Sequence, residues 1–453
     1  MNWQGLRVHF VGIGGSGMSG IAKVMAARGA VISGSDLHES STLDGLRSMG
    51  MKIFVGHDAS NIGGALLIVR STAIVDSNVE LMAARTSGIE ILERAEALSR
   101  LLIGKTSVAV AGTHGKTTTT SMLTVALQSC GLDPSFAIGA SVRNFGTNAH
   151  HGSGEIFVVE ADESDGSFTS YKPNGAIITN IELDHVDNFK DLSSIDSLFE
   201  EFVKTIKEEL VICSDDAGSL RLLEKAKGSD LNLVTYGTTG DPDLLIDRIY
   251  LGARESKARL VFRGRVWGEL ELVIPGRHNL LNAAAAIAMG DQLGAPYQGL
   301  MAGLSKFTGA RRRFEIRGNE KGVTVIDDYG HHPTELRATL ETARNFAGSG
   351  RVLVIFQPHR FSRTAAFANE FANELAKADH TYLLEIYAAS ENPLPGITSA
   401  TIASKMPSGS VTYEPSMPEV ISKVIKDAKS GDVILTLGAG DVSSLAPLIV
   451  ENL

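Results

Sequence analysis

The chain has 453 residues, of which 21% are charged, and a formal net charge of −10 at pH 7. This length predicts about three domains, and the acidic balance without a long Lys/Arg block argues against a nucleic-acid-binding protein. The two cysteines, Cys130 and Cys213, form no CxxC pair, which argues against a disulfide scaffold or a zinc knuckle and favours the reducing cytoplasm. No apolar run has the length needed to span a bilayer, so we expect no membrane insertion.

Apolar, strand-like runs alternate with helical segments along most of the chain, a pattern that predicts mostly parallel α/β architecture. In the first predicted domain, residues 1–104, strands are expected at Leu6–Ile13, Ala30–Ser35 and Ala65–Ser71, with helices at Gly17–Arg28 and Glu93–Ile103.

In the second predicted domain, residues 105–306, strands are expected at Val108–Ala111, Ile156–Glu160, Ala176–Thr179 and Leu210–Ser214. Residues Leu244–Ile274 alternate polar and apolar side chains without helical segments, which predicts a small antiparallel appendage. An Ala-rich helix should follow at Asn279–Leu293, with Asn279 as its N-cap.

The third predicted domain, residues 307–453, is expected to be a second doubly wound sheet. Its predicted strands are Val323–Asp327, Val352–Phe356, Thr381–Glu385 and Val433–Leu437. The chain shows no repeat of solenoid period, so separate domains rather than a repeat array account for the length.

The stretch Val108–Thr120, VAVAGTHGKTTTT, is a strand followed by a glycine-rich turn, with Lys116 and Thr117 opening a helix. Backbone N–H groups of such a turn hold phosphates, the lysine reaches the outer phosphates, and the hydroxyl binds Mg²⁺. The position where the usual P-loop has its first glycine is Val110, and the glycine comes later, at Gly112. This short P-loop predicts that the chain handles ATP.

A second glycine-rich turn, GIGGSG at residues 12–17, lies between the first strand and the first helix, and Asp36 ends the next strand. Glycines and an acidic residue in this order are typical of dinucleotide-binding folds and would favour an NAD-dependent dehydrogenase. A full dinucleotide site needs two mononucleotide halves, however, and the P-loop domain begins before the second half is complete. The turn alone shows that a diphosphate can approach the backbone, and a tight turn without a ligand stays open.

Carboxylates follow the strand Ile156–Glu160 in the sequence IFVVEADESD. Glu160 stands at the carboxyl end of the strand, where P-loop enzymes present an acid to the metal. The sequence also allows that the carboxylates after Glu160 are only solvated loop charges; these are Asp162, Glu163 and Asp165. His185, in NIELDH after the next strand, either binds a second metal ion or caps a turn.

Four further polar segments follow strands or precede helices. Arg311–Arg313 is either an exposed basic run or a phosphate clamp, and Arg360 and Arg363 are spaced so that both could hold one carboxylate. The other two segments are GRHNLLN around Asn279 and Asn282, and DDYGHHP at residues 327–333. Each alone is more often solvated surface, but together they occupy the ends of strands, where open α/β sheets bind ligands.

The ordered motifs GIGGSGMSG, AGTHGKTTTT, VEADESD, NIELDH, GRHNLLN, RRRFE, DDYGHHP and QPHRFSRT resemble those of the Mur ligases, and LGAGD at residues 437–441 extends the likeness. The resemblance implies three domains: a Rossmann-like domain for a UDP-sugar, a central P-loop ATPase and a C-terminal Rossmann-like domain for an amino acid. The motifs are most similar to the branch that joins L-alanine to the lactyl carboxylate of UDP-N-acetylmuramate through an acyl phosphate.

The same resemblance implies a role for each motif residue. Lys116, Glu160 and His185 are expected to be catalytic, with Thr117, Glu160 and His185 holding two Mg²⁺ ions that Mn²⁺ can replace. ATP would be bound by Gly112, Thr113, His114, Gly115, Lys116, Thr117, Thr118, Asn279, Asn282, Arg313 and Asp328. The UDP-sugar would be bound by Gly12, Ile13, Gly14, Gly15, Ser16, Gly17, Ser35, Asp36, Ser71, Thr72, Gly146, Thr147 and Asn148. L-Alanine would be bound by Tyr329, His359, Arg360 and Arg363.

Three other functions are kept open by the sequence. A branch of the family that attaches a ready-made tripeptide during cell-wall recycling shares the P-loop and needs a roomier pocket beside Arg360 and Arg363. An NAD-dependent dehydrogenase would leave the P-loop without a role, and an ATP-binding regulatory module would bind nucleotide without turnover. The expected partners are small molecules only, and the protein is a monomer or a homodimer.

Overall fold

The computed structural model of the protein describes residues 2–389 and 391–453. Contacts between residues divide the chain into two units. The first unit comprises the residues up to Asn180, Ser197–Tyr236 and Ala285–Gly303, and the second comprises Ile181–Asp196, Gly237–Ala284 and Leu304–Leu453. The three domains predicted from the sequence, with boundaries after residues 104 and 306, stay a prediction.

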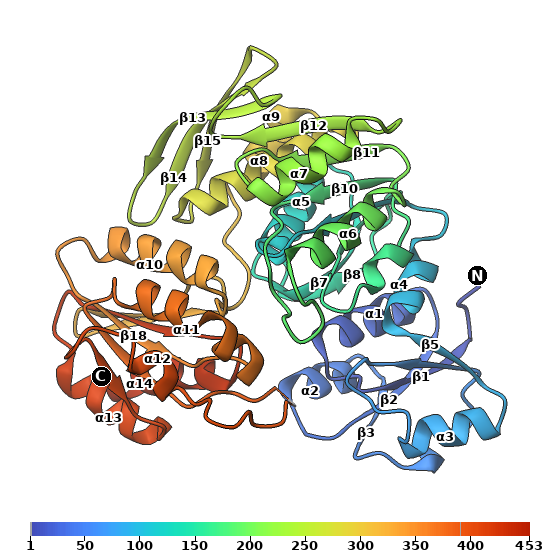
Figure 1. The fold of residues 1–453 in the computed structure, drawn as a ribbon. Helices are drawn as coiled ribbons and strands as arrows, with labels where there is room; N and C mark the ends of the chain where they lie inside the picture. The colour runs from blue at the N-terminus through green and yellow to red at the C-terminus, as the bar shows by residue number, and fades with distance from the viewer. Residues whose placement is uncertain (1, 390) are drawn as a thin grey trace. The chain divides into compact units, whose positions relative to one another are not determined.

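The first unit begins with a five-stranded parallel sheet in the order β3-β2-β1-β4-β5 (Figure 1). Its strands are β1 (Arg7–Val11), β2 (Val31–Asp36), β3 (Lys52–Val55), β4 (Leu67–Arg70) and β5 (Glu90–Glu93). The predicted strand Leu6–Ile13 ends earlier than expected because Gly12, with φ of +82°, turns the chain directly after Val11. The helices of this part are α1 (Ser16–Ala27), α2 (Ser41–Ser48), α3 (Val79–Thr86) and α4 (Arg94–Leu102), with a 3₁₀ turn η1 (Ala59–Ile62).

A second sheet of the same unit has the strand order β12-β11-β10-β6-β9-β7-β8, parallel except for β8, which is antiparallel to β7. These strands are β6 (Thr106–Ala111), β7 (Ser135–Val142), β8 (Thr147–His150), β9 (Ile156–Glu160), β10 (Gly175–Ile178), β11 (Glu209–Cys213) and β12 (Asn232–Gly237). Because β6 pairs with β9 on one side and β10 on the other, the turns after these three strands meet at one edge of the sheet.

Helix α1 fastens the two sheets of the first unit to each other. It packs on β7 and β8, and its Lys23 Nζ donates a 2.7 Å hydrogen bond to the side-chain oxygen of Asn148. The Asn148 Nδ2 in turn donates to the Ser16 carbonyl at 2.9 Å. The glycine-rich turn before α1 and the P-loop sheet therefore belong to one body.

The second unit contains the antiparallel strands β13 (Leu244–Leu251), β14 (Ser256–Phe262) and β15 (Arg265–Leu272), which confirms the predicted antiparallel pattern of this segment. Its larger sheet has the order β16-β17-β21-β18-β19-β20. The strands are β16 (Glu315–Glu320), β17 (Val323–Asp328), β18 (Val352–Phe356), β19 (His380–Leu383), β20 (Val411–Tyr413) and β21 (Val433–Leu437). Strand β16 is antiparallel to β17, so this sheet is mixed and not wholly parallel.

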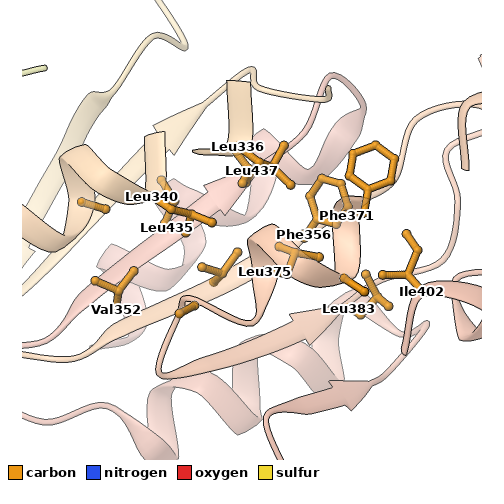
Figure 2. Packing of buried hydrophobic residues seen from close by; sticks show 14 of the residues in the cluster. Leu336, Leu340, Val352, Phe356, Phe371, Leu375, Leu383, Ile402, Leu435 and Leu437 are labelled. Atoms are coloured by element: carbon orange, nitrogen blue, oxygen red, sulfur yellow. The ribbon is translucent and has the colours of Figure 1, made fainter. Parts of the chain in front are cut away.

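Alternate residues of the central strands of this sheet serve two separate cores. Val352, Val354 and Phe356 of β18 pack with Leu435 and Leu437 of β21 under α10, α11 and α12 (Figure 2). The residues between them, including Leu353 and Ile434, pack on the other face against α13 and α14. Figure 1 shows α13 and α14 on the opposite side of the sheet from α10 and α11. Burial on both faces explains why these strands are continuous apolar runs in the sequence.

The helices of the second half of the chain extend the alternation of strands and helices. They are α10 (Pro333–Ala347), α11 (Phe361–Leu375), α12 (Ala400–Ala403), α13 (Met417–Asp427), η3 (Asp441–Ser444) and α14 (Leu445–Asn452). The helices between the first sheet and β16 are α5 (Lys116–Ser129), η2 (Ser167–Ser170), α6 (Leu192–Val203), α7 (Ala217–Ala226), α8 (Arg277–Gln292) and α9 (Tyr297–Leu304). Within residues 2–389 and 391–453, no helix combines the length and apolar character that crossing a bilayer requires.

The Ala-rich helix α8 begins at Arg277, so the prediction that Asn279 is its N-cap was wrong. Asn279 lies inside the first turn, where its Nδ2 donates a 2.7 Å hydrogen bond to the carbonyl of Pro275. The side chain therefore ties the preceding segment to the helix as a donor instead of accepting from a free helical N–H.

The two-core arrangement predicts that Leu435→Ala destabilises the C-terminal sheet by about 2–5 kcal/mol, since it empties a fully buried site between β18 and α11. Thermal unfolding followed by circular dichroism measures the change. Leu448→Ala is the matched control because Leu448 is 42% exposed on α14, and equal effects of the two substitutions would contradict the assigned core.

Candidate active site

The P-loop follows β6 and takes its shape from hydrogen bonds to the segment after β10. Gly112 has φ of +131°, and a Cβ there would lie 2.1 Å from the Thr179 Oγ1, so only glycine fits. The N–H of Thr113 donates to the Asn180 carbonyl at 3.0 Å, and the N–H of His114 donates to the Asn180 Oδ1 at 2.8 Å. The loop is thus held from outside by a neighbouring strand end.

Lys116 lies over this loop and forms an ion pair with Glu163, whose role could not be decided from the sequence. Its Nζ donates to the carbonyls of Gly112 at 2.7 Å and Thr113 at 3.1 Å, and it lies 2.7 Å from the Glu163 Oε2. Burial lowers the Lys116 pKa, but the Glu163 carboxylate outweighs it and the net pKa is raised, so the ammonium stays charged. Glu163 is 2% exposed. Glu163 is therefore not a solvated loop charge. Asp165 is exposed, as expected if it is a solvated loop charge.

Thr117 and Glu160 face each other across the first turn of α5. The Thr117 hydroxyl donates to the Glu160 Oε1 at 2.8 Å, and the N–H of Gly139 on β7 donates to the other carboxylate oxygen at 2.7 Å. Glu160 is at the end of β9, in register with Val110 of β6, which brings its carboxylate to the P-loop. A hydroxyl and a carboxylate side by side are the oxygen donors that Mg²⁺ prefers. Thr118 is buried in the same turn.

The glycine-rich turn after β1 is held in the same manner by the end of β2. The N–H groups of Gly12 and Ile13 donate to the Ser35 carbonyl at 2.9 and 3.0 Å, and the Gly14 N–H donates to the Asp36 Oδ2 at 2.8 Å. Asp36 therefore shapes the turn itself. Gly15, Ser16 and Gly17 continue into α1, and a Cβ on Gly17 would lie 3.3 Å from the Arg94 Cδ.

Other residues predicted for the UDP-sugar lie in the same unit with different exposures. Ser71 is half-buried and Thr72 is exposed, directly after β4. Gly146 is exposed and Thr147 is half-buried in the hairpin of β7 and β8. The side chain of Asn148 is buried and engaged with α1, so only its backbone is left to meet a ligand in this arrangement.

In the second unit, each of the two arginines predicted to bind an amino acid holds a carboxylate of the chain. Arg363 is buried and its Nε donates to the Asp184 Oδ1 at 2.8 Å, with a terminal nitrogen 2.7 Å from the same atom. Arg360 forms an ion pair with Asp187. Burial raises the pKa of Asp184, yet the Arg363 guanidinium outweighs it and holds that pKa well below its usual range. Sequence reasoning missed both aspartates, although NIELDH and the residues after it contain them.

His185 and His359 lie next to this arginine pair. His185 adopts φ of +49°, and its N–H donates to the Asp184 Oδ1 at 2.7 Å, so Asp184 links it to Arg363. The His359 Nδ1 is 3.1 Å from a terminal nitrogen of Arg363, and the His359 ring stacks on Tyr387 with centroids 5.7 Å apart. Tyr387 is a further aromatic wall that no sequence motif indicated.

Tyr329 and the basic run Arg311–Arg313 also come together in the second unit. The guanidinium groups of Arg312 and Arg313 lie 4.9 and 5.2 Å from the centre of the Tyr329 ring. Arg312 also donates to the Gly438 carbonyl at 2.6 Å. Only Arg311 is exposed, so this segment is not a solvated basic run.

Asp328 and Asn282 are buried. The Asp328 carboxylate accepts hydrogen bonds from the N–H groups of Phe314 at 2.7 Å and Gly330 at 2.8 Å. Burial raises the Asp328 pKa. Asn282 is on α8, one turn beyond Asn279. The first unit thus brings together the P-loop, Glu160 and the glycine-rich turn, and the second brings together His185, the arginine pair and Tyr329. The joint metal site of Thr117, Glu160 and His185 stays a prediction.

Comparison with protein families finds matches along almost the whole chain. The model of the Mur ligase family, catalytic domain, matches residues 7–106, the Mur ligase middle domain matches residues 110–290, and the Mur ligase glutamate ligase domain matches residues 312–440.

Individual relatives agree with these matches. The UDP-N-acetylmuramate–L-alanine ligase of Paenarthrobacter aurescens is 48% identical over 99% of this chain and 97% of its own length. The solved structure of the UDP-N-acetylmuramate–alanine ligase of Thermotoga maritima superposes with a TM-score of 0.85, at 31% identity and 99% coverage of both chains. The murein peptide ligase of Psychrobacter arcticus shares the fold, with a TM-score of 0.74 at 24% identity over 99% of this chain and 98% of its own.

The second unit should lose stability as the pH falls below neutrality. Burial lowers the pKa of His331 and of His359 to about 3 and that of His278 to about 4. An unfolded histidine takes up its proton near pH 6.5. The stabilisation of each neutral imidazole is therefore complete above about pH 6.5 and is lost toward its folded pKa, by about 2 kcal/mol per histidine between pH 7 and pH 5.

Calorimetric melting temperatures between pH 8 and pH 5 test this expectation. His331→Gln should flatten the decline in melting temperature, while His38→Gln, at an exposed position, should leave it unchanged. A decline of the same steepness in all three proteins would count against buried neutral histidines as its cause.

Proposed function

Because the chain belongs to the Mur ligase family, we propose that it joins L-alanine to the lactyl carboxylate of UDP-N-acetylmuramate in peptidoglycan precursor synthesis, with ATP as the energy source. The observation that carries this function is the identity of 48% over nearly the full length of both chains with a relative named for that reaction. The P-loop with Glu160 beside Thr117 supplies the chemistry that such a ligase needs.

A carboxylate does not react with an amine, so it has to be activated first. In the proposed reaction, a lactyl carboxylate oxygen attacks the γ-phosphorus of ATP, and the bond to ADP breaks. The neutral amine of L-alanine then attacks the acyl carbon, and the tetrahedral intermediate expels phosphate and leaves the amide after loss of one proton. Transfer between two anions depends on positioning and charge neutralisation more than on covalent help from the protein.

The P-loop residues would bind the phosphates of ATP. Lys116 is already desolvated and charged over the loop, so a phosphate oxygen can take the place of the carbonyl and carboxylate oxygens that it contacts. Thr117 and Glu160 would hold a Mg²⁺ ion, which neutralises phosphate charge when bound. His185 is proposed to hold a second ion. Further nucleotide-binding residues are proposed to be Asn279, Asn282, Arg313 and Asp328.

The arginine pair would bind the carboxylate of L-alanine. Arg363 and Arg360 each hold an aspartate in a charge-assisted pair, which supports the proposal that these guanidinium groups bind a carboxylate. An incoming amino acid would exchange with one of these aspartates instead of entering an unpaired site. Tyr329, His359 and Tyr387 would form the walls of a small side-chain pocket.

The glycine-rich turn is proposed to receive the diphosphate of UDP through its backbone, and residues Ser71, Thr72 and 146–148 to lie nearer the sugar. With this assignment, the GIGGSG motif binds the diphosphate of UDP, so no nicotinamide cofactor is needed to explain it. Since ATP and UDP-sugars are cytoplasmic metabolites, we also propose that the protein acts in the cytoplasm.

The proposed function predicts that phosphate release from ATP in the presence of Mg²⁺ and UDP-N-acetylmuramate depends on L-alanine. Mass spectrometry should find a product heavier by one alanyl residue. Release only with the L-Ala-γ-D-Glu-diaminopimelate tripeptide would assign the protein to the recycling branch instead. Nucleotide binding without turnover would indicate a regulatory module, and reduction of bound NAD would revive the dehydrogenase.

Substituting Glu160→Ala should lower kcat by about 10²–10³-fold, because the metal-binding carboxylate beside the P-loop is lost. Calorimetric binding of UDP-N-acetylmuramate should stay within about twofold of wild type, since the glycine-rich turn lies on the other sheet. Glu155→Ala is the matched control, because Glu155 is exposed at the other end of the same strand. Equal losses of UDP-sugar affinity and turnover would contradict this division of labour.

Replacing Arg360 by alanine should raise the KM for L-alanine by about 10–100-fold and leave the KM for ATP nearly unchanged, since one charge-assisted contact is lost. Arg363→Ala should act in the same direction, although it also leaves the Asp184 charge buried without its main partner. Arg337→Ala, at an exposed position on α10, should change neither constant. An equal rise in both constants for Arg360→Ala would show that this arginine does not bind the amino acid.

A further inference from the structure

A fully buried carboxylate lies behind the glycine-rich turn, on helix α3. Glu80 is 0% exposed. Its Oε2 accepts a 2.5 Å hydrogen bond from the Ser35 hydroxyl and lies 3.0 Å from the His57 Nδ1. Its Oε1 accepts from the Asn61 Nδ2 at 2.7 Å. None of these contacts involves a residue of the P-loop or the arginine pair.

Glu80 is ionised in this environment. Burial by itself raises the pKa of a carboxyl group, but the His9 ring, 3.7 Å away, and the hydrogen bonds from Ser35 and Asn61 outweigh it and bring the pKa of Glu80 to about 2. Taking a charge out of water is costly even when it is well paired, and an apolar side chain would fill the same volume at lower cost. Filling space in the core therefore does not explain why this position has a charged side chain that is contacted by Ser35, His57 and Asn61 from separate segments of the chain.

Ser35 connects this carboxylate to the glycine-rich turn. Its hydroxyl is bound to Glu80, while its carbonyl accepts the N–H groups of Gly12 and Ile13 at 2.9 and 3.0 Å. The next residue, Asp36, accepts the Gly14 N–H at 2.8 Å. The position of Ser35 therefore determines where three consecutive amides of the turn lie, and Glu80 holds Ser35 from the side away from the turn.

We infer that Glu80 is a positioning residue for the diphosphate of the UDP-sugar: through Ser35 it holds the glycine-rich turn in its binding geometry without touching the ligand. This inference rests on the proposed function, because it takes the turn to be the diphosphate site. The Ser35 side chain, which the sequence predicted to contact UDP, acts through its buried hydroxyl on Glu80 and not on the ligand.

Binding of UDP to the purified full-length protein, measured by calorimetry, tests the inference with the variants Glu80→Ala, Ser35→Ala and the double variant. Each single variant should weaken UDP binding by about tenfold. The double variant should be no weaker than about the weaker single variant, because both changes break the same link. ADP binding at the P-loop should stay within about twofold of wild type in all three.

Two further variants separate positioning from a general structural role. Asn61→Ala removes a donor from the Glu80 oxygen that does not touch Ser35, so it should lower the melting temperature with little change in UDP affinity. Glu80→Gln keeps the shape and one acceptor and should restore part of the affinity lost in Glu80→Ala. If Glu80→Ala does not fold, Glu80→Gln replaces it in the double-variant comparison with Ser35→Ala, so that the non-additivity is still measured.

Several results would overturn the inference: unchanged UDP affinity in Ser35→Ala, additive losses in the double variant, or equal losses of UDP and ADP affinity. Additive losses would show that the Ser35 hydroxyl contacts the ligand independently of Glu80. Failure of the proposed function is recognised separately, because wild-type protein would then bind neither UDP nor UDP-N-acetylmuramate. Gly14→Ala, whose Cβ would lie 2.8 Å from the Asp36 Oδ2 that accepts the Gly14 N–H, should weaken UDP binding and so tests whether the turn is the site.

Discussion

Both glycine-rich turns of the first unit, which we propose bind phosphates, depend on one kind of backbone interaction, in which the end of the neighbouring parallel strand accepts the N–H groups of the turn. The Ser35 carbonyl holds Gly12 and Ile13, and the Asn180 carbonyl holds Thr113. These hydrogen bonds fix the first N–H groups of each turn. The N–H groups that follow in the same turn are therefore already in place before a ligand binds, which is the preorganisation that anion binding requires. The strand order of each sheet, with the accepting strand next to the turn, is therefore part of the binding chemistry.

In both units, the cations predicted to bind substrate anions are paired with carboxylates of the chain itself. In the first unit the cation of the P-loop is held by a buried glutamate, Glu163, and in the second unit two guanidinium groups are held by Asp184 and Asp187. Each cation is thus oriented and neutralised by its partner, and Lys116 and Arg363 are also largely buried. If these residues bind substrate anions as proposed, the anion exchanges one partner for another, and much of the desolvation cost of the two buried cations has been met during folding.

Local patterns were enough to predict the elements that carry the chemistry. The P-loop, Glu160 and the strand ends near Asp36 and Asp328 follow from an apolar run and the residues just after it. The partners of the charged groups did not follow, because Glu163 meets Lys116, and Asp184 meets Arg363, across long stretches of chain. The start of α8 was misplaced for a related reason: Asn279 has the composition of an N-cap, but its amide group binds Pro275, a contact that propensity does not encode.

The attachment of α1 to β7 and β8 has a consequence for ligand design. Since Asn148 holds both Ser16 and Lys23, the glycine-rich turn proposed for the diphosphate and the P-loop are fastened within the same unit. A bivalent inhibitor that joins a uridine diphosphate group to an adenine nucleotide would therefore meet two anchor points at a constant separation. A stiff tether of matching length would lose little entropy on binding there, whereas a flexible tether would give up most of the gain in effective concentration.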